Sequence, residues 1–430
     1  MAHLIRSAFY VILLLVVCVI PFALAQRNDD VYVTPSGGGP CMLGPWSYVS
    51  NYPGGAIKAP AVGSDGTLAY VAGGYLDQGG NTDLTYTYDP GFDTWTQKAS
   101  MVGRRYGAPG VYAANVNKFY VFGGLDQNFA LTATTQIYDV ATNTWSLGTP
   151  MPDPVGRFFP GAAYDDASGK IYVIGGDDDL GFERTNNWIF DPVTDTWDSS
   201  TALPIPIAVA GAGQTEDNGK IYVMGTYNGG AGSTLNQIYD ITSNTWSSGA
   251  AIPAPYFHPA TADVSGGVYL MGGGNPDVAG DSTSALRGPN GIKGLTRRHV
   301  PNTSYTDVRR YDVATDTWST TPSLNHARSY TTGTAIGNTA IVVGGFDGAI
   351  FQDTNTVEKS VCGAQTPTPT ATFTPTPTAT PTATATATPT ATATATPTPT
   401  PTPTPGTPTP TPPQRPTPTP RPRPTPFPRP

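Results

Sequence analysis

The strongest constraint on the fold of this chain is an internal repeat with a period near 50 residues. Its clearest element is an aromatic residue followed by Asp, a four-residue turn, Thr and Trp. The offset from the aromatic residue to the Trp is seven in every copy. The five copies run from Tyr88 to Trp95, Tyr138 to Trp145, Phe190 to Trp197, Tyr239 to Trp246, and Tyr311 to Trp318. Such a period is typical of folds in which similar small units stack side by side.

A second repeated element lies 14 to 16 residues before most of these aromatic residues. It is a short apolar run that ends in glycine, and it occurs six times. A run that is apolar at nearly every position is typical of a strand covered on both faces, so each run is predicted to be an inner strand. We expect the glycines where the backbone is crowded or needs a positive φ. They are Gly73 and Gly74, Gly123 and Gly124, Gly175 and Gly176, Gly225, Gly272 and Gly273, and Gly344 and Gly345.

The order of glycine pair, Tyr-Asp and Trp at this period resembles the Kelch repeat, and the resemblance covers residues 41–362. It implies an all-β fold, a six-bladed β-propeller of four-stranded antiparallel blades, in which Tyr and Trp side chains fill the gaps between sheets. Two departures are local. Gly225 is followed by Thr226 instead of a second glycine, and the fifth blade carries a loop insertion at residues 275–305.

The two ends of the repeat region predict how the ring closes. The sixth repeat has its glycine pair but no Trp, whereas Trp46 stands unpaired before the first apolar run. The N-terminal segment is therefore predicted to supply the outermost strand of the last blade. Counting along the repeat brings Cys41 and Cys362 to the same hairpin position, so we predict a disulfide between them. The alternative is two unpaired thiols.

The termini of the chain differ from the repeats. Residues 1–25 contain Arg6, an apolar run from Ala8 to Ile20 and a small-residue cleavage pattern, the layout of a secretory signal peptide. Residues 366–430 alternate Thr with Pro or Ala and hold 23 of the 45 prolines. We predict a disordered, extended stalk there, either a spacer that could carry O-glycans or an inert linker. The propeller domain is assigned to residues 26–365, with its core at 41–362.

Charge and hydropathy limit the partners and the location. Residues 26–365 hold 18 Lys and Arg against 31 Asp and Glu, a net charge of −13. Phosphate binding needs the opposite sign, so no nucleic-acid partner is expected. No apolar segment long enough to span a membrane follows the signal peptide. We expect a secreted or cell-surface protein that acts as a monomer.

The resemblance implies that ligands bind at one end of the propeller channel. Ten to twelve residues after each Trp, five of six repeats carry a basic residue, and a basic ring there would suit a carboxylate, a sulfate or an acidic peptide. The candidate ligand-binding residues are Lys58, Arg105, Arg157, His258 and Arg328, with Ala208 in the remaining repeat. The alternative is that these side chains bond backbone carbonyl groups of neighbouring loops.

Aromatic residues flank the same loops. They could stack on sugar rings, but packing between blades is the favoured interpretation for most of them. They are Tyr106, Phe158, Phe159, Tyr256, Phe257, Tyr330 and Phe346. The insertion adds Arg287, Lys293, Arg297, Arg298 and His299, and it could extend the basic ring or be a mobile segment.

Motifs for metal binding and catalysis are weak. After the signal peptide, His258, His299 and His326 are not at ligand spacing, and no Cys-x-x-Cys occurs. The acidic loop at 177–179 with Glu183 lacks the spaced-ligand order of an EF-hand calcium loop. We predict no metal, no cofactor and no catalytic residue.

These features together predict a protein- or carbohydrate-binding interaction module. The alternative is a sugar-modifying enzyme that uses the same face. Among Kelch-like enzymes, an exported sialic acid mutarotase is the nearer architectural parallel. The copper-radical galactose oxidases need a Tyr followed directly by His, and this sequence has no such pair.

Overall fold

The computed structural model describes residues 41–363 except 78, 206–218, 226, 229–230 and 276–302. The chain divides into two compact units, Met1–Thr368 and Pro369–Pro430, and every described residue belongs to the first. The predicted signal peptide, the predicted stalk and most of the 275–305 insertion therefore lie outside the described residues. The described residues contain strands and turns but no α-helix, and hence no helix that could cross a membrane.

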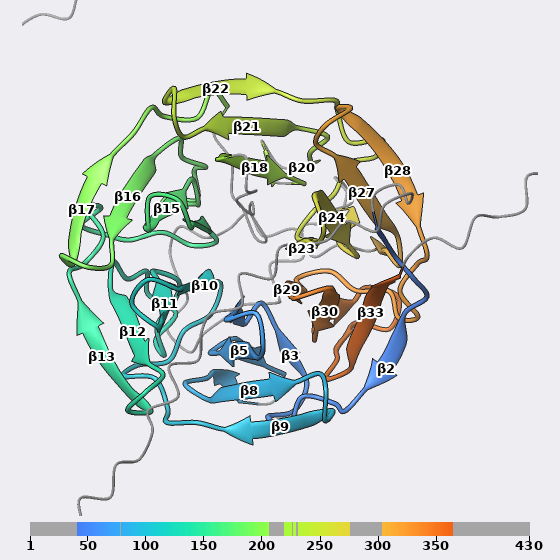
Figure 1. The fold of residues 1–430 in the computed structure, drawn as a ribbon. Coiled ribbons are helices and arrows are strands. Elements are labelled where there is room, and N and C mark those ends of the chain that lie inside the picture. Colours follow the sequence, from blue (N-terminus) through green and yellow to red (C-terminus); the bar gives the residue numbers. More distant parts are fainter. Residues whose placement is uncertain are drawn as a thin grey trace, which may run out of the picture. The chain divides into compact units, whose positions relative to one another are not determined.

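Six antiparallel sheets stand around a central channel, as Figure 1 shows. This arrangement confirms the predicted six-bladed propeller. Blade 1 contains β4 (Ala61–Ser64), β5 (Ala69–Ala72), β8 (Thr85–Asp89) and β9 (Thr94–Gln97). Blade 2 contains β10 (Gly110–Ala113), β11 (Lys118–Phe122), β12 (Thr135–Asp139) and β13 (Thr144–Gly148). Blade 3 contains β14 (Gly161–Asp165), β15 (Lys170–Ile174), β16 (Asn187–Asp191) and β17 (Thr196–Ser199).

The other three blades follow the same order. The described strands of blade 4 are β18 (Lys220–Met224), β21 (Asn236–Asp240) and β22 (Thr245–Ser248). Blade 5 contains β23 (Ala260–Asp263), β24 (Gly267–Met271), β27 (Val308–Asp312) and β28 (Thr317–Thr321). Blade 6 contains β29 (Thr332–Ile336), β30 (Thr339–Val343), β33 (Val357–Gly363) and β2 (Ser47–Val49).

The apolar runs predicted as inner strands are β5, β11, β15, β18, β24 and β30. Nearly every residue of these strands is buried, as expected for a strand covered on both faces. In the five blades with four described strands, each run is the second strand, and a strand nearer the channel precedes it. Tyr70 of blade 1 lies 5.7 Å from Phe119 and 6.1 Å from Tyr138 of blade 2, ring centre to ring centre. The repeat tyrosines therefore fill the gaps between blades.

The N-terminal segment closes the ring. β2 pairs with β33, so the outermost strand of blade 6 comes from the other end of the repeat region, and Figure 1 shows it beside β33. The short strand β1 (Met42–Leu43) pairs with the end of β33 and brings Cys41 and Cys362 into a disulfide with a Cα–Cα distance of 5.7 Å. The predicted outer strand is confirmed, and the predicted cysteine pair forms.

The repeated Trp residues join neighbouring blades around the outside of the ring. The indole Nε1 of each one donates a hydrogen bond to a backbone carbonyl oxygen at the end of the preceding blade, at 2.8 to 3.0 Å. The pairs are Trp46 with Pro322, Trp95 with Ser50, Trp145 with Ala99, Trp197 with Thr149, Trp246 with Thr201, and Trp318 with Ala250. The belt is complete over all six blades.

The turn before each Trp adds a second contact between blades. Two residues before five of the Trp residues stands an Asp or Asn with φ between 52° and 54°, a left-handed conformation that these two residue types tolerate. In blade 2, the side-chain oxygen of this residue, Asn143, accepts hydrogen bonds from the Ala99 amide of blade 1 and from the Tyr138 hydroxyl. The four-residue spacing between the Tyr-Asp and Thr-Trp elements is therefore a geometric requirement of this contact between neighbouring blades.

The paired glycines join blades near the channel. The second glycine of the pair donates its amide hydrogen to a carbonyl of the next blade, as in Gly74 to Arg105 and Gly124 to Arg157, both at 2.7 Å. A Cβ atom on Gly124, whose φ is 78°, would lie 2.8 Å from the Tyr106 carbonyl oxygen. Only glycine fits this position without displacement of the backbone.

We predict that replacing both disulfide cysteines, Cys41→Ala with Cys362→Ala, lowers the free energy of unfolding by about 3–5 kcal/mol, because the bond closes a loop spanning nearly the whole ring. The measurement is urea unfolding of the oxidised protein with and without reductant. Reductant should destabilise the parent chain and leave the double variant unchanged. Equal stability of the oxidised parent and the variant would contradict a role for the bond in ring closure.

Candidate ligand-binding face

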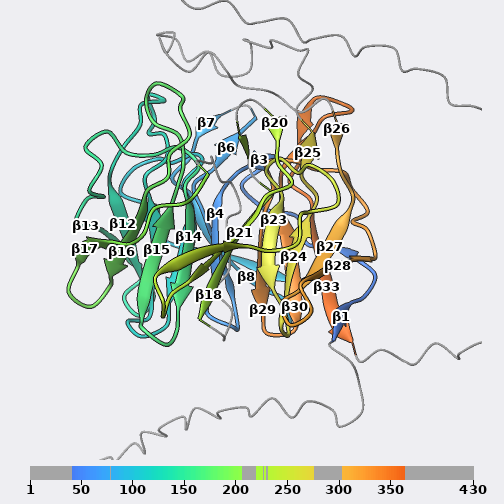
Figure 2. The ribbon, with the colours of Figure 1, turned by 90° about the horizontal axis from the view of Figure 1, so that it is seen from above.

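Short hairpins project from one end of the ring. They follow the apolar second strands and include β6 (Tyr75–Leu76) with β7 (Gly80–Asn81), β19 (Tyr227–Asn228) with β20 (Ala231–Gly232), β25 (Gly274–Asn275) with β26 (Thr303–Ser304), and β31 (Phe346–Asp347) with β32 (Gln352–Asp353). Figure 2 shows β6, β7, β20, β25 and β26 together at this end. The segments that join one blade to the next reach the same end, as β3 (Ile57–Lys58) does by pairing with β6. We call this end the loop face.

The five predicted basic residues occupy three different structural positions. The five described joining segments share a residue with positive φ at an equivalent place, two or three residues before the innermost strand, and these residues are Ala59, Gly107, Phe159, His258 and Tyr330. Arg105, Arg157 and Arg328 each stand two residues before the positive-φ residue of their own segment. Lys58 stands one residue before Ala59, and His258 is itself the positive-φ residue. Successive side chains of an extended segment point in opposite directions, so the five do not form one ring.

Arg328 is fully buried and makes only internal contacts. Its guanidinium donates to the carbonyl oxygens of Gly344 and Thr356 at 3.1 and 3.0 Å, and it forms a 2.6 Å ion pair with Glu358, whose side chain is also fully buried. Burial lowers the pKa of Arg328, and the Glu358 carboxylate opposes this shift. The geometry matches the alternative interpretation, in which the arginine bonds neighbouring loops.

Arg157 and Arg105 are also buried. Arg157 pairs with Asp153 at 2.5 Å and donates to the Asn186 side chain at 3.1 Å, while its guanidinium lies 5.2 Å from the Trp188 ring. Arg105 donates to the Arg104 carbonyl oxygen and to the hydroxyl of Thr134, and burial lowers its pKa to about 10. Each of the three arginines bonds the residue directly before the third strand of a blade, namely Thr134, Asn186 and Thr356. The three arginines therefore hold equivalent places between the second and third strands.

Lys58 lies nearer the surface of the loop face. Its Nζ forms a 3.1 Å ion pair with Asp353 of blade 6 and lies 4.6 Å from the centre of the Tyr75 ring. The Asp353 side chain is almost fully buried, burial raises its pKa, and the nearby Lys58 ammonium opposes that shift. No hydrogen-bond partner is present for Asp353 Oδ2 among the described residues. This pair joins the last blade to the first.

An aromatic cluster brings together side chains of three blades. The imidazole of His258 from blade 5 lies 4.3 Å from the Phe159 ring of blade 3 and 4.4 Å from the Tyr330 ring of blade 6, measured between centroids. The other aromatic residues predicted to flank these loops, Tyr106, Phe158, Tyr256, Phe257 and Phe346, are buried. They pack between blades, as the favoured interpretation holds.

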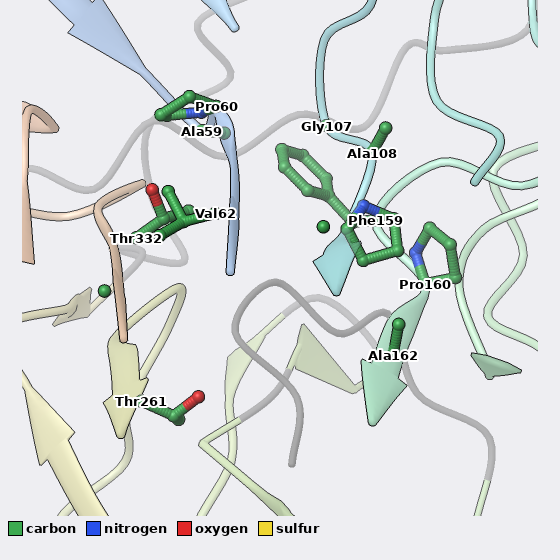
Figure 3. A pocket seen from close by; sticks show the side chains of 13 residues that line it. Ala59, Pro60, Val62, Gly107, Ala108, Phe159, Pro160, Ala162, Thr261 and Thr332 are labelled. Atoms are coloured by element: carbon green, nitrogen blue, oxygen red, sulfur yellow. The ribbon is translucent and has the colours of Figure 1, made fainter. Parts of the chain in front are cut away.

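A cavity of about 70 Å³ lies inside the ring beside this cluster, at the starts of the innermost strands. Its lining is small and mostly apolar, with the hydroxyl-bearing Thr261 and Thr332 among its walls (Figure 3). A cavity of this volume has room for a few water molecules. The loop face, at the end of the ring where the hairpins project, is the candidate site for a larger ligand.

The hairpins of the loop face contain features that the sequence analysis missed. Asp126, Asp178 and Asp347 follow the glycine pairs at the same offset, and each accepts backbone amide hydrogens of its own hairpin tip, as Asp178 does from Leu180 and Phe182. Between these caps and the returning strand stand exposed apolar residues, namely Leu180, Phe182, Ile350 and Phe351. The signal was present in the sequence, because an Asp two residues after a glycine pair, as in these three repeats, predicts a turn whose tip faces solvent.

Metal binding finds little support in the described ranges, where no group of three or more His, Cys, Asp and Glu residues is placed to hold an ion. In the acidic loop, Asp178 forms an ion pair with Arg184. His326 lies 3.1 Å from Asp347, and His299 of the insertion lies outside the described residues.

We predict that Arg328→Met lowers the free energy of unfolding by about 3–5 kcal/mol, because Glu358 would remain buried without its cation. Adding Glu358→Gln should restore part of the loss, because it removes the unpaired buried charge and its amide oxygen can still accept from the Asn325 amide, while its NH2 group would face the His326 amide without an acceptor. Urea unfolding of the parent and both variants is the measurement. A single variant as stable as the parent would show that Arg328 is dispensable for the fold.

Comparison with known proteins agrees with this architecture. The KLHDC2/KLHL20/DRC7 Kelch-repeats domain matches residues 58–273 and 117–345, which together cover most of the described propeller. The solved structure of YjhT superposes with a TM-score of 0.57 at 19% identity, covering 72% of this chain and 95% of that one, a likeness of fold.

Three curated relatives share part of their length with this chain. Beta-scruin of Limulus polyphemus is 29% identical over 36% of this chain and 17% of its own length. Kelch-like protein 35 of Mus musculus is 30% identical over 47% of this chain and 34% of its own. Kelch-like protein terF of Aspergillus terreus is 26% identical over 64% of this chain and 59% of its own length. The chain thus spans less than two thirds of each relative. Its repeats, blade order and matched domain place the chain in the Kelch-repeat family.

Proposed function

We propose that this chain is an extracellular or surface-displayed binding module that recognises a protein or carbohydrate ligand on its loop face. The observation that carries the proposal is the exposure of large apolar side chains at hairpin tips on that face, including Phe182 and Phe351, which are 59% and 63% exposed. Apolar side chains gathered on one face of a soluble domain favour a contact surface.

Three features support export. Residues 1–25 have the layout of a signal peptide, and the Cys41–Cys362 disulfide is a bond that persists in oxidising compartments. The Thr/Pro-rich residues 366–430 fit a spacer between the propeller and a surface. Together they suit a binding domain presented outside the cell.

We expect binding on glycan and peptide arrays to weaken about tenfold or more in a Phe351→Ser variant of the full chain, because a contact residue of the loop face is lost. The matched control is Phe92→Ser, since Phe92 is 81% exposed in the turn between β8 and β9, away from the hairpins. Both positions are exposed, so neither change should lower the melting temperature. Loss of binding in the control, with normal binding by Phe351→Ser, would place the ligand elsewhere.

A second candidate function is modification of a sugar on the same face. The Lys58–Asp353 pair favours it, because a carboxyl group and an ammonium group held 3.1 Å apart near the loop face form an acid/base pair. Tyr75 lies beside the pair and offers an aromatic surface for a sugar ring.

If this alternative holds, the full chain should accelerate the exchange of N-acetylneuraminic acid anomers measured by NMR, and Asp353→Asn should remove at least nine tenths of the acceleration. Asp198→Asn is the control, because Asp198 is exposed on the outer strand β17. An exchange rate equal to that in buffer would exclude this substrate and leave the binding module as the function.

A further inference from the structure

We infer that the partner of the loop face is a cationic polypeptide that presents apolar side chains. This inference rests on the proposed function, since it names the chemistry of the ligand for the same surface. It reverses the expectation of an anionic ligand that the basic residues suggested. Three properties of the described hairpins carry it: where the apolar tips stand, what charge surrounds them, and where the basic side chains are held.

The apolar tips belong to blades 3 and 6. Leu180 and Phe182 are 61% and 59% exposed on the hairpin of blade 3, and Ile350 and Phe351 are 58% and 63% exposed on the hairpin of blade 6. These two blades stand on opposite sides of the channel in Figure 1, where β15 and β30 mark them. A ligand that covers both tips must extend across the mouth of the ring. A polypeptide does this more readily than a single sugar.

The hairpins of blades 1, 2, 3 and 6 are acidic. Segments 75–81, 125–131, 177–183 and 346–353 contain eight Asp and Glu residues and no Lys or Arg. Two cations contact them from outside, because Arg184 pairs with Asp178 and Lys58 with Asp353. The blade 5 insertion adds four Lys and Arg against two Asp in sequence, so the carboxylates of these segments still outnumber the cations. The hairpins of the loop face, which we call its rim, therefore keep a negative charge. Charge complementarity therefore selects Lys and Arg in the partner.

The basic side chains near the channel cannot offset this charge for an anionic ligand. Arg157 and Arg328 are buried in ion pairs with Asp153 and Glu358, and Arg105 is buried between loops. An acidic peptide would meet the carboxylates of the rim before it met any of these guanidinium groups. A cationic peptide meets opposite charge at the rim and apolar contacts at the tips.

The test uses three synthetic peptides of 12 residues that alternate Lys with Leu, Lys with Ser, and Glu with Leu. Their affinity for the full chain is measured by fluorescence anisotropy at low and high salt. We expect the Lys-Leu peptide to bind at least tenfold more tightly than the other two and to weaken as salt screens the charges. The combined change Phe182→Ser with Phe351→Ser should weaken it about tenfold. The combined change Asp179→Asn with Glu183→Gln should weaken it and reduce its salt dependence.

Matched controls distinguish binding at the rim from nonspecific binding elsewhere on the protein surface. Leu147→Ser and Asp198→Asn change exposed residues on the outer strands β13 and β17, and both should bind the Lys-Leu peptide as the parent does. Equal binding by the rim variants and these controls overturns the inference. Tight binding of the Glu-Leu peptide that is lost with Phe182→Ser and Phe351→Ser also overturns it, while leaving the proposed binding face in place. If no peptide binds, the inference fails, and the proposed function is judged on the arrays alone.

Discussion

The structure depends on closing a ring of six sheets. A single four-stranded blade cannot bury both of its faces, so each blade is stable only between two neighbours. The Trp belt on the outside, with its indole-to-carbonyl bonds, and the glycine-to-carbonyl bonds near the channel hold neighbours together at two radii. The two ends of the repeat region meet in blade 6, where β2 pairs with β33 and the Cys41–Cys362 disulfide links the two segments covalently.

Most polar side chains that recur with the repeat serve this closure. Asn143 bridges the turn of its own blade to the preceding blade, and Arg328 with Glu358 holds the loops of the last blade. Repetition at a fixed position is therefore evidence for a structural role in this fold. The residues free to recognise a ligand are those in which the blades differ, and these are concentrated at the hairpin tips of the loop face, such as Phe182 and Phe351.

Burial also separates the charges of the two signs. Guanidinium groups near the channel are buried, and their N–H groups bond carboxylates or carbonyl oxygens of the protein. These bonds satisfy the donors, but the groups are then not accessible to a ligand. Carboxylates such as Asp179 stay at the surface, where hydration stabilises them. A chain whose repeat region has a net charge of −13 thus presents an acidic surface even where its sequence repeats a basic residue.

The sequence by itself determined the number of blades, the buried inner strands, the strand that closes the last blade and the cysteine pair. Each of these follows from spacing, because the seven-residue offset from Tyr88 to Trp95 recurs and hydrogen-bonded sheets fix the register of everything between. Only the tertiary structure decided which side chains reach the loop face. The sequence pattern accepted any basic residue ten to twelve residues after a Trp, and this range contains three different positions of the joining segment. A shift of one residue in an extended segment turns a side chain to the opposite side. Lys58, Arg105 and His258 therefore look equivalent in the sequence but lie in different surroundings: Lys58 in an ion pair with Asp353, Arg105 between loops and His258 in the aromatic cluster.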